Sequence, residues 1–74
     1  MQNFLFDTDY SIAIFESKIH VFNYVDILKL TDNQIVLAMS GFTLHLDGEN
    51  LRVKQLQKRE ILIEGTLSHV GFSR

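Results

Sequence analysis

Hydrophobic and polar residues alternate with a period of two along most of this chain, which is the pattern of strands with one buried face. Between residues 27 and 67 the alternation forms short segments separated by turn signals. Residues 26–31 and 34–39, for example, flank Asp32-Asn33, a pair that suits a tight hairpin. The pattern predicts an all-β fold, a small antiparallel meander of about six to eight short strands that forms a sandwich or a rolled sheet.

Three glycines are predicted to shape the backbone of this sheet. Ser40-Gly41 permits a chain reversal, because glycine turns without a Cβ clash. Gly48 lies in Asp47-Gly48-Glu49-Asn50, which is predicted to be the strongest turn in the chain. Gly65 interrupts the last strand pattern, where glycine often marks a bulge or a close backbone approach. Gly41 and Gly48 are therefore expected between strands, and Gly65 within one.

The segment 18–24 carries apolar side chains on both faces. Ile19 and Val21 fall on one face, and Phe22 and Tyr24 fall on the other. Such a strand is buried on two sides or packs against a second subunit. Phe22 and Tyr24 are therefore candidate interface anchors, as aromatic residues often are. The alternative is that both are ordinary core residues.

The size of the chain points to self-association. It has 74 residues, with no cysteine and no proline. We expect one domain over residues 1–74, with residues 1–9 as a loosely attached N-terminal segment. Domains of this size usually need additional stabilisation from disulfides, a bound metal or oligomerisation. Disulfides are excluded because the chain has no cysteine. Because no proline blocks a strand, an open sheet edge invites pairing with another chain, and a homo-oligomer is predicted.

Nothing in the sequence predicts export or direct insertion into a membrane. The first residues carry Asp7 and Asp9 instead of the basic region of a signal peptide. The apolar runs are far shorter than the ~20 residues that a spanning helix needs. The expected location is the cytoplasm.

Charge gives only a weak indication of partners, because the formal net charge is −2. Four cations nevertheless cluster in sequence as a candidate contact face: Arg52, Lys54, Lys58 and Arg59. A solvated strand face and turn is the plainer interpretation. The cluster leaves open an alternative function, a small β-barrel module that binds nucleic acid or another polyanion through residues 52–59. The net charge opposes the backbone attraction that such binding needs.

No residue pattern predicts catalysis or a cofactor. His20, His45 and His69 lie about 25 residues apart, without the close spacing of metal ligands. Ser68 and His69 are adjacent in sequence, and neighbouring strand residues face opposite ways. Glycine-rich phosphate loops and nucleophile motifs are absent. We expect no catalytic, cofactor-binding or metal-binding residues and no enzymatic activity.

The chain resembles the YabP/YqfC family of sporulation proteins in three segments, Ile19–Leu37, Gly48–Lys54 and Glu60–Gly65. The resemblance covers roughly residues 10–72. It favours the YqfC-like branch, because strands precede Ile19. The shared motifs are strands and turns, so they specify a fold better than an activity, and the family offers no catalytic residues to carry over.

The resemblance also implies a cellular setting. It indicates a small cytoplasmic protein of endospore-forming Firmicutes that acts in the mother cell and has a protein partner, a membrane protein encoded nearby. Combined with the expected self-association, it predicts a non-enzymatic structural or interaction protein that self-associates and scaffolds or binds this partner.

Overall fold

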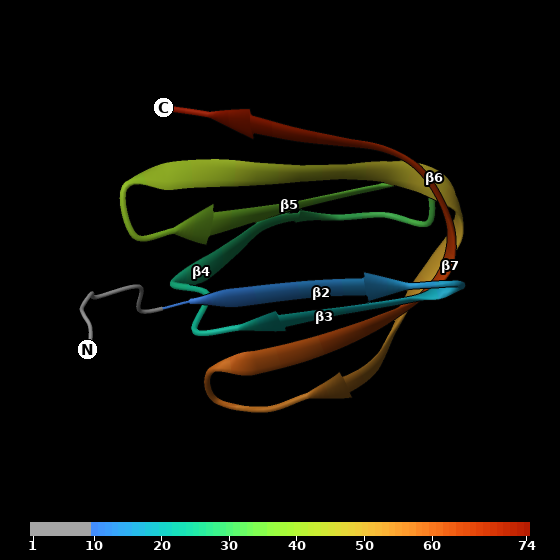
Figure 1. The fold of residues 1–74 in the computed structure, drawn as a ribbon, viewed down its shortest axis with the longest axis horizontal. Coiled ribbons are helices and arrows are strands. Elements are labelled where there is room, and N and C mark those ends of the chain that lie inside the picture. The colour runs from blue at the N-terminus through green and yellow to red at the C-terminus, as the bar shows by residue number, and fades with distance from the viewer. Residues whose placement is uncertain (1–9) are drawn as a thin grey trace.

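The computed structural model describes residues 10–74, and every regular element in this range is a β-strand. One antiparallel sheet holds the strands in the order β2-β3-β7-β6-β5-β4 (Figure 1). The strands are β2 (Ser11–Phe15), β3 (Lys18–Phe22), β4 (Asp26–Leu30), β5 (Gln34–Met39), β6 (Phe42–Leu56) and β7 (Glu60–Ser73). The all-β prediction is confirmed. The expectations for residues 1–9, including Asp7 and Asp9, lie outside the described residues.

Two strands are much longer than the pattern predicted. β6 has 15 residues and β7 has 14. The first half of β6 pairs with β5, and the first half of β7 pairs with β3. The β6–β7 hairpin therefore belongs to both halves of the sheet. It bends midway, and the two halves face each other around the core (Figure 1).

The bend lies at Asp47-Gly48-Glu49-Asn50, which the sequence predicted to be the strongest turn between strands. That prediction is wrong, because β6 continues through this segment. The chain continues as β6 through this segment because neighbouring backbones use its hydrogen-bonding groups. Gly48 N donates to Asn33 O at 3.0 Å, and Leu51 N donates to Asp32 O at 2.8 Å. The tip of the β4–β5 hairpin thus holds this part of β6 in the sheet.

Gly48 and Gly65 allow the two long strands to approach closely at the bend. A Cβ at Gly48 would lie 2.0 Å from Thr66 O, and one at Gly65 would lie 2.6 Å from Asn50 O. Gly65 also has a φ of +145°, in the region that favours glycine. The predicted close approach at Gly65 is confirmed, and Gly48 has the same role instead of forming a turn.

The two other predicted reversals are confirmed. Asp32-Asn33 lies in the β4–β5 connection, and Gly41, with a φ of +94°, lies in the β5–β6 connection. Thr31 stabilises the first of these, because its Oγ1 accepts a hydrogen bond from Gln34 N at 2.9 Å. These short connections set the register of β4, β5 and the first half of β6.

The core is formed by the inward-facing residues of the four central strands. The described side chains that are buried in the core cluster are all apolar, and none belongs to the edge strands β2 and β4. They are Ile19, Val21, Ile35, Leu37, Met39, Leu44, Leu46, Leu51, Ile61 and Ile63. Within β3, β5 and β7 these residues recur at every second position, as the period-2 alternation of the sequence predicted.

Candidate interaction surfaces

The four cations of segment 52–59 lie on two elements, the strand β6 and the turn that follows it. Arg52 and Lys54 lie on β6 and contact the same carboxylate oxygen. Arg52 Nε and Lys54 Nζ are each 3.9 Å from Glu64 Oε1. Lys58 and Arg59 follow in the β6–β7 turn. Because one carboxylate serves two cations, part of the positive charge on β6 is neutralised within the protein.

Arg59 is engaged by the neighbouring β3–β4 connection. Its Nη1 donates to Asn23 Oδ1 at 3.1 Å, and its backbone oxygen accepts a hydrogen bond from Asn23 N. Lys58 and Arg59 line a surface hollow with Tyr24 and Val25, among others. The contact role predicted for these cations stays a prediction, and the structure assigns Arg59 a local structural contact.

Phe22 and Tyr24 do not share a face, so that part of the interpretation is wrong. Phe22 lies opposite Ser11 and Glu60 on the outer face of the sheet and is 40% exposed. Tyr24 packs against the core, and its hydroxyl donates to Gln57 O at 3.2 Å. The cause is Asn23, whose φ of +69° breaks the strand alternation between the two rings. Phe22 remains a candidate interface anchor.

The three histidines have three separate settings. His20 Nε2 lies 3.5 Å from Glu60 Oε1, and His45 Nε2 lies 2.9 Å from Ser73 Oγ. His69 is opposite Asp47 in the β6–β7 register. Within residues 10–74, no group of three or more His, Asp and Glu side chains is placed to hold a metal ion.

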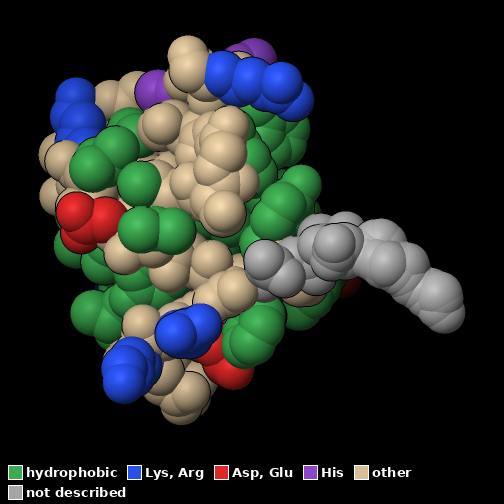
Figure 2. Space-filling model, turned by 90° about the vertical axis from the view of Figure 1, so that its left-hand side faces the viewer, with side chains coloured by type: hydrophobic (Ala, Val, Ile, Leu, Met, Phe, Trp, Pro, Cys, Tyr) green, Lys and Arg blue, Asp and Glu red, His purple; other side chains and the backbone are tan. Residues whose placement is uncertain are grey.

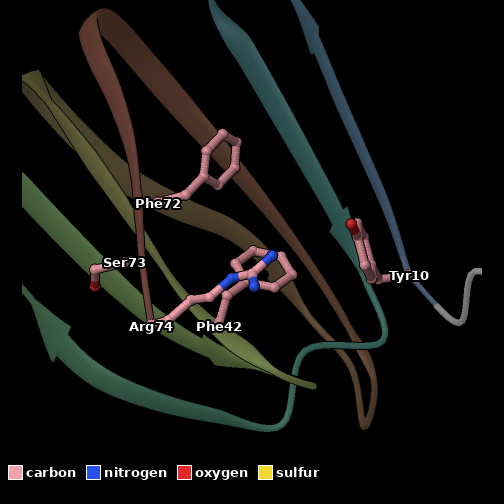
Figure 3. A pocket seen from close by; sticks show the side chains of 5 residues that line it. All are labelled: Tyr10, Phe42, Phe72, Ser73 and Arg74. Atoms are coloured by element: carbon pink, nitrogen blue, oxygen red, sulfur yellow. The ribbon is translucent and has the colours of Figure 1, made fainter.

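An aromatic cluster lies at one end of the molecule and was missed in the sequence. Phe42 stands between Tyr10 and Phe72, with ring centroids 5.1 Å and 5.7 Å apart and both pairs edge-on. With Ser73 and Arg74, the three rings line an open hollow of about 530 Å³ (Figure 3). The rings come from the residue before β2, the start of β6 and the end of β7. The β6–β7 register brings Phe42 near Phe72, and the bend of the sheet brings Tyr10 to them from the other half.

Hydrophobic side chains are exposed over much of this end of the molecule, with Lys and Arg side chains toward its upper and lower margins (Figure 2). Phe72 is 63% exposed although it lies opposite the buried Leu44. Exposed aromatic and aliphatic side chains beside cations are typical of surfaces that bind other proteins.

The model of the YabP family matches residues 11–74. The chain belongs to the YabP family. The matched range contains all six described strands, so the family relationship covers the whole sheet. The match is to the family as a whole, and the YqfC-like branch stays a prediction. No curated protein and no solved structure gives a significant match to this YabP-family chain.

The described part of this YabP-family protein contains no membrane-spanning helix: nothing helical in residues 10–74 has the length and apolar character required. Among residues 10–74, the surface features available for interactions are the two edge strands β2 and β4, the aromatic end and the cations of segment 52–59.

Proposed function

We propose that this YabP-family protein is a non-enzymatic structural and interaction protein of endospore formation. It self-associates and scaffolds or binds a membrane-protein partner in the mother cell. Family membership supports the link to sporulation, and the surface of the sheet supports the interaction role. The mother-cell location and the membrane-protein partner rest on the family resemblance.

The observation that carries the proposal is the exposure of large apolar side chains on a very small sheet. Within residues 10–74, large hydrophobic side chains are exposed on both edge strands, at the aromatic end, and at or next to the β3–β4 and β6–β7 connections. They are Tyr10, Ile14, Phe15, Phe22, Val25, Leu28, Leu30, Leu56 and Phe72. Single exposed apolar residues are normal, but grouped ones mark binding surfaces. A small domain without disulfides also gains stability when a second chain covers such residues.

The arrangement of cations favours a protein partner over a polyanion. Arg52 and Lys54 share Glu64, and Arg59 is bonded to Asn23, so these side chains already have partners within the protein. Binding to phosphate backbones needs several free cations on one surface. We therefore expect no salt-dependent retention on a polyanion matrix, and no difference between the wild type and the Arg52→Glu/Lys54→Glu variant.

The mass of the protein in solution tests self-association. Light scattering over a concentration series, at low and at high salt, is expected to show a discrete dimer or larger closed assembly. The assembly should persist at high salt, because its interface is apolar. A strict monomer at the highest concentration would overturn self-association, and attention would move to a different chain that covers the same surfaces.

The cellular part of the proposal has a separate test. A fluorescent fusion expressed in a sporulating host is expected in the mother cell, and deletion of the gene is expected to lower the yield of resistant spores. An unchanged spore yield, or fluorescence only in the forespore, would contradict the assigned role.

A further inference from the structure

We propose that β2 is the edge at which two copies of this chain pair, antiparallel and about a twofold axis at Ala13. The six-stranded sheet of one copy then continues into that of the other. The inference rests on the proposed self-association and assigns it a surface.

Among the described residues, 10–74, the sheet ends with β2 on one side and β4 on the other, and these two edge strands differ in how well they are protected against pairing. β4 carries Asp26 and Lys29, and its register with β5 shifts between Ile27 and Lys29. Charged residues and a bulge are the features by which edge strands avoid further pairing. β4 is therefore the protected edge of this sheet.

β2 has none of these protective features. Its sequence, Ser11–Phe15, holds no charged residue and no proline, and its register with β3 is continuous over all five residues. Ile14 and Phe15 are 47% and 54% exposed. An uncharged, regular and partly apolar edge is the kind that accepts another strand.

The hydrogen bonds of β3 determine which backbone groups of β2 point away from β3. Asn23 N donates to Arg59 O, and Gly65 N donates to Ser17 O at 2.9 Å. These bonds lie at both ends of the β3–β7 ladder, so the odd-numbered residues of β3 exchange hydrogen bonds with β7. The even-numbered residues of β3 must then face β2.

The same alternation continues into β2. His20 of β3 is paired with Ala13, so the backbone N–H and C=O groups of Ala13 point toward β3, in the plane of the sheet. Ile12 and Ile14 direct their N–H and C=O groups outward, to the open edge. A strand added at this edge would therefore form its hydrogen bonds with Ile12 and Ile14.

A second copy of β2 fits these groups. With the twofold axis at Ala13, Ile12 lies opposite Ile14 of the second copy, and each such pair exchanges two hydrogen bonds. Ser11 lies opposite Phe15 of the second copy, so a small side chain meets a large one. In this register, each of the five residues of β2 has a partner residue in β2 of the second copy.

The absence of charge on β2 favours a second copy as the occupant. In a twofold interface a strand meets itself, so any charge near its centre would lie close to a like charge. β2 has no such charge, and its apolar side chains on both faces match themselves. The pairing also covers Ile14 and Phe15, two of the exposed apolar residues of the described chain.

A matched pair of variants tests the edge. Ile14 and Leu30 are aliphatic residues of similar exposure, 47% and 52%, on the two opposite edge strands. Ile14→Lys is expected to raise the dissociation constant of the dimer about 100-fold, from a loss of roughly tenfold for each of the two isoleucines. Leu30→Lys is expected to leave the dimer unchanged. Light scattering gives the mass, and circular dichroism checks the fold of both variants.

A cross-link tests the register without disturbing the fold. The chain has no cysteine, so Ala13→Cys can form a disulfide only between copies. The two Ala13 positions would form a non-hydrogen-bonded pair with Cα atoms about 4.5 Å apart, within the range of a disulfide. Ala13→Cys is expected to give a covalent dimer under mild oxidation, and Leu28→Cys on β4 is expected to remain monomeric on a non-reducing gel.

The outcomes separate the two proposals. A dimer that survives Ile14→Lys, does not cross-link through Ala13→Cys and is lost in Leu30→Lys would overturn the assignment to β2 and leave self-association intact. A wild-type monomer at all concentrations, with no cross-link through Ala13→Cys, would overturn both.

Discussion

Replacing Gly48 by alanine tests the bend that joins the two halves of the sheet. The added Cβ would lie 2.0 Å from Thr66 O, 3.0 Å from Thr66 C and 3.1 Å from Leu67 Cα. All three are backbone atoms of β7, so β6 and β7 must separate by about 1 Å to reach the shortest Cβ distances that proteins tolerate. This movement also strains the hydrogen bond from Gly48 N to Asn33 O.

We expect Gly48→Ala to lower the free energy of unfolding by about 3 kcal/mol or more, at the upper end of the cost of overpacking. Since ~1 kcal/mol shifts the melting temperature of a domain of this size by roughly 4–8 °C, the expected loss is roughly 12–24 °C. Thermal unfolding followed by circular dichroism measures it.

Gly41→Ala is the matched control for this variant. Gly41 has a φ of +94° but no atom within 4 Å of an added Cβ, so alanine meets backbone strain without a clash. The expected cost is about 1–2 kcal/mol. A Gly48→Ala protein that melts within a few degrees of the wild type, or above Gly41→Ala, would refute the close approach at the bend.

Three further predictions concern the core, the ion pairs and the first hairpin. Leu46→Ala creates a cavity at a fully buried site and is expected to lower the free energy of unfolding, measured by urea titration, by about 2–5 kcal/mol. Leu56→Ala, at an exposed site, should change it by less than ~0.5 kcal/mol. Glu64→Gln removes both exposed ion pairs of β6 and is expected to cost less than about 1 kcal/mol, with the difference vanishing in high salt. Thr31→Val removes the acceptor of Gln34 N and is expected to cost about 1 kcal/mol, and an unchanged urea midpoint would show that this turn does not depend on the hydroxyl.

Much of the fold follows from local sequence patterns. The alternation of Ile35, Leu37 and Met39 predicted a strand with one buried face, and the structure buries all three. Asp32-Asn33 and Gly41 predicted two of the reversals. Asp and Asn favour turns through their side chains, and Gly41 permits a φ of +94°, so both signals are local and do not depend on the strand partners.

The bend at Gly48 was not predictable in the same way. A segment with Asp, Gly and Asn has the composition of a turn, and hydrogen bonds to Asn33 and Asp32 help to keep it extended. Those partners lie in another hairpin, so no local pattern reveals them. The meander expectation missed the pairing of β3 with β7 for the same reason, because the two strands are distant in sequence.

The candidate surfaces show the same limit. The sequence identified Phe22 as a candidate interface anchor and the cations as a cluster, but it could not show that Glu64 lies beside both Arg52 and Lys54. That contact depends on the β6–β7 register. The aromatic cluster and the outward-facing groups of Ile12 and Ile14 also depend on register, which a single sequence leaves undetermined.

The pairing of β3 with β7 also has a consequence during synthesis. Lys18–Phe22 leaves the ribosome first and pairs with Glu60–Glu64, which is made about forty residues later. At 5–20 residues per second, the β2–β3 hairpin waits roughly 2–8 s for its partner. During that interval Ile19 and Val21 are exposed in addition to the open edge of β2. Until β7 is synthesised, the nascent chain therefore exposes a hairpin that other chains can bind. The rate of translation sets the time for which a chaperone or a second nascent chain can bind this hairpin.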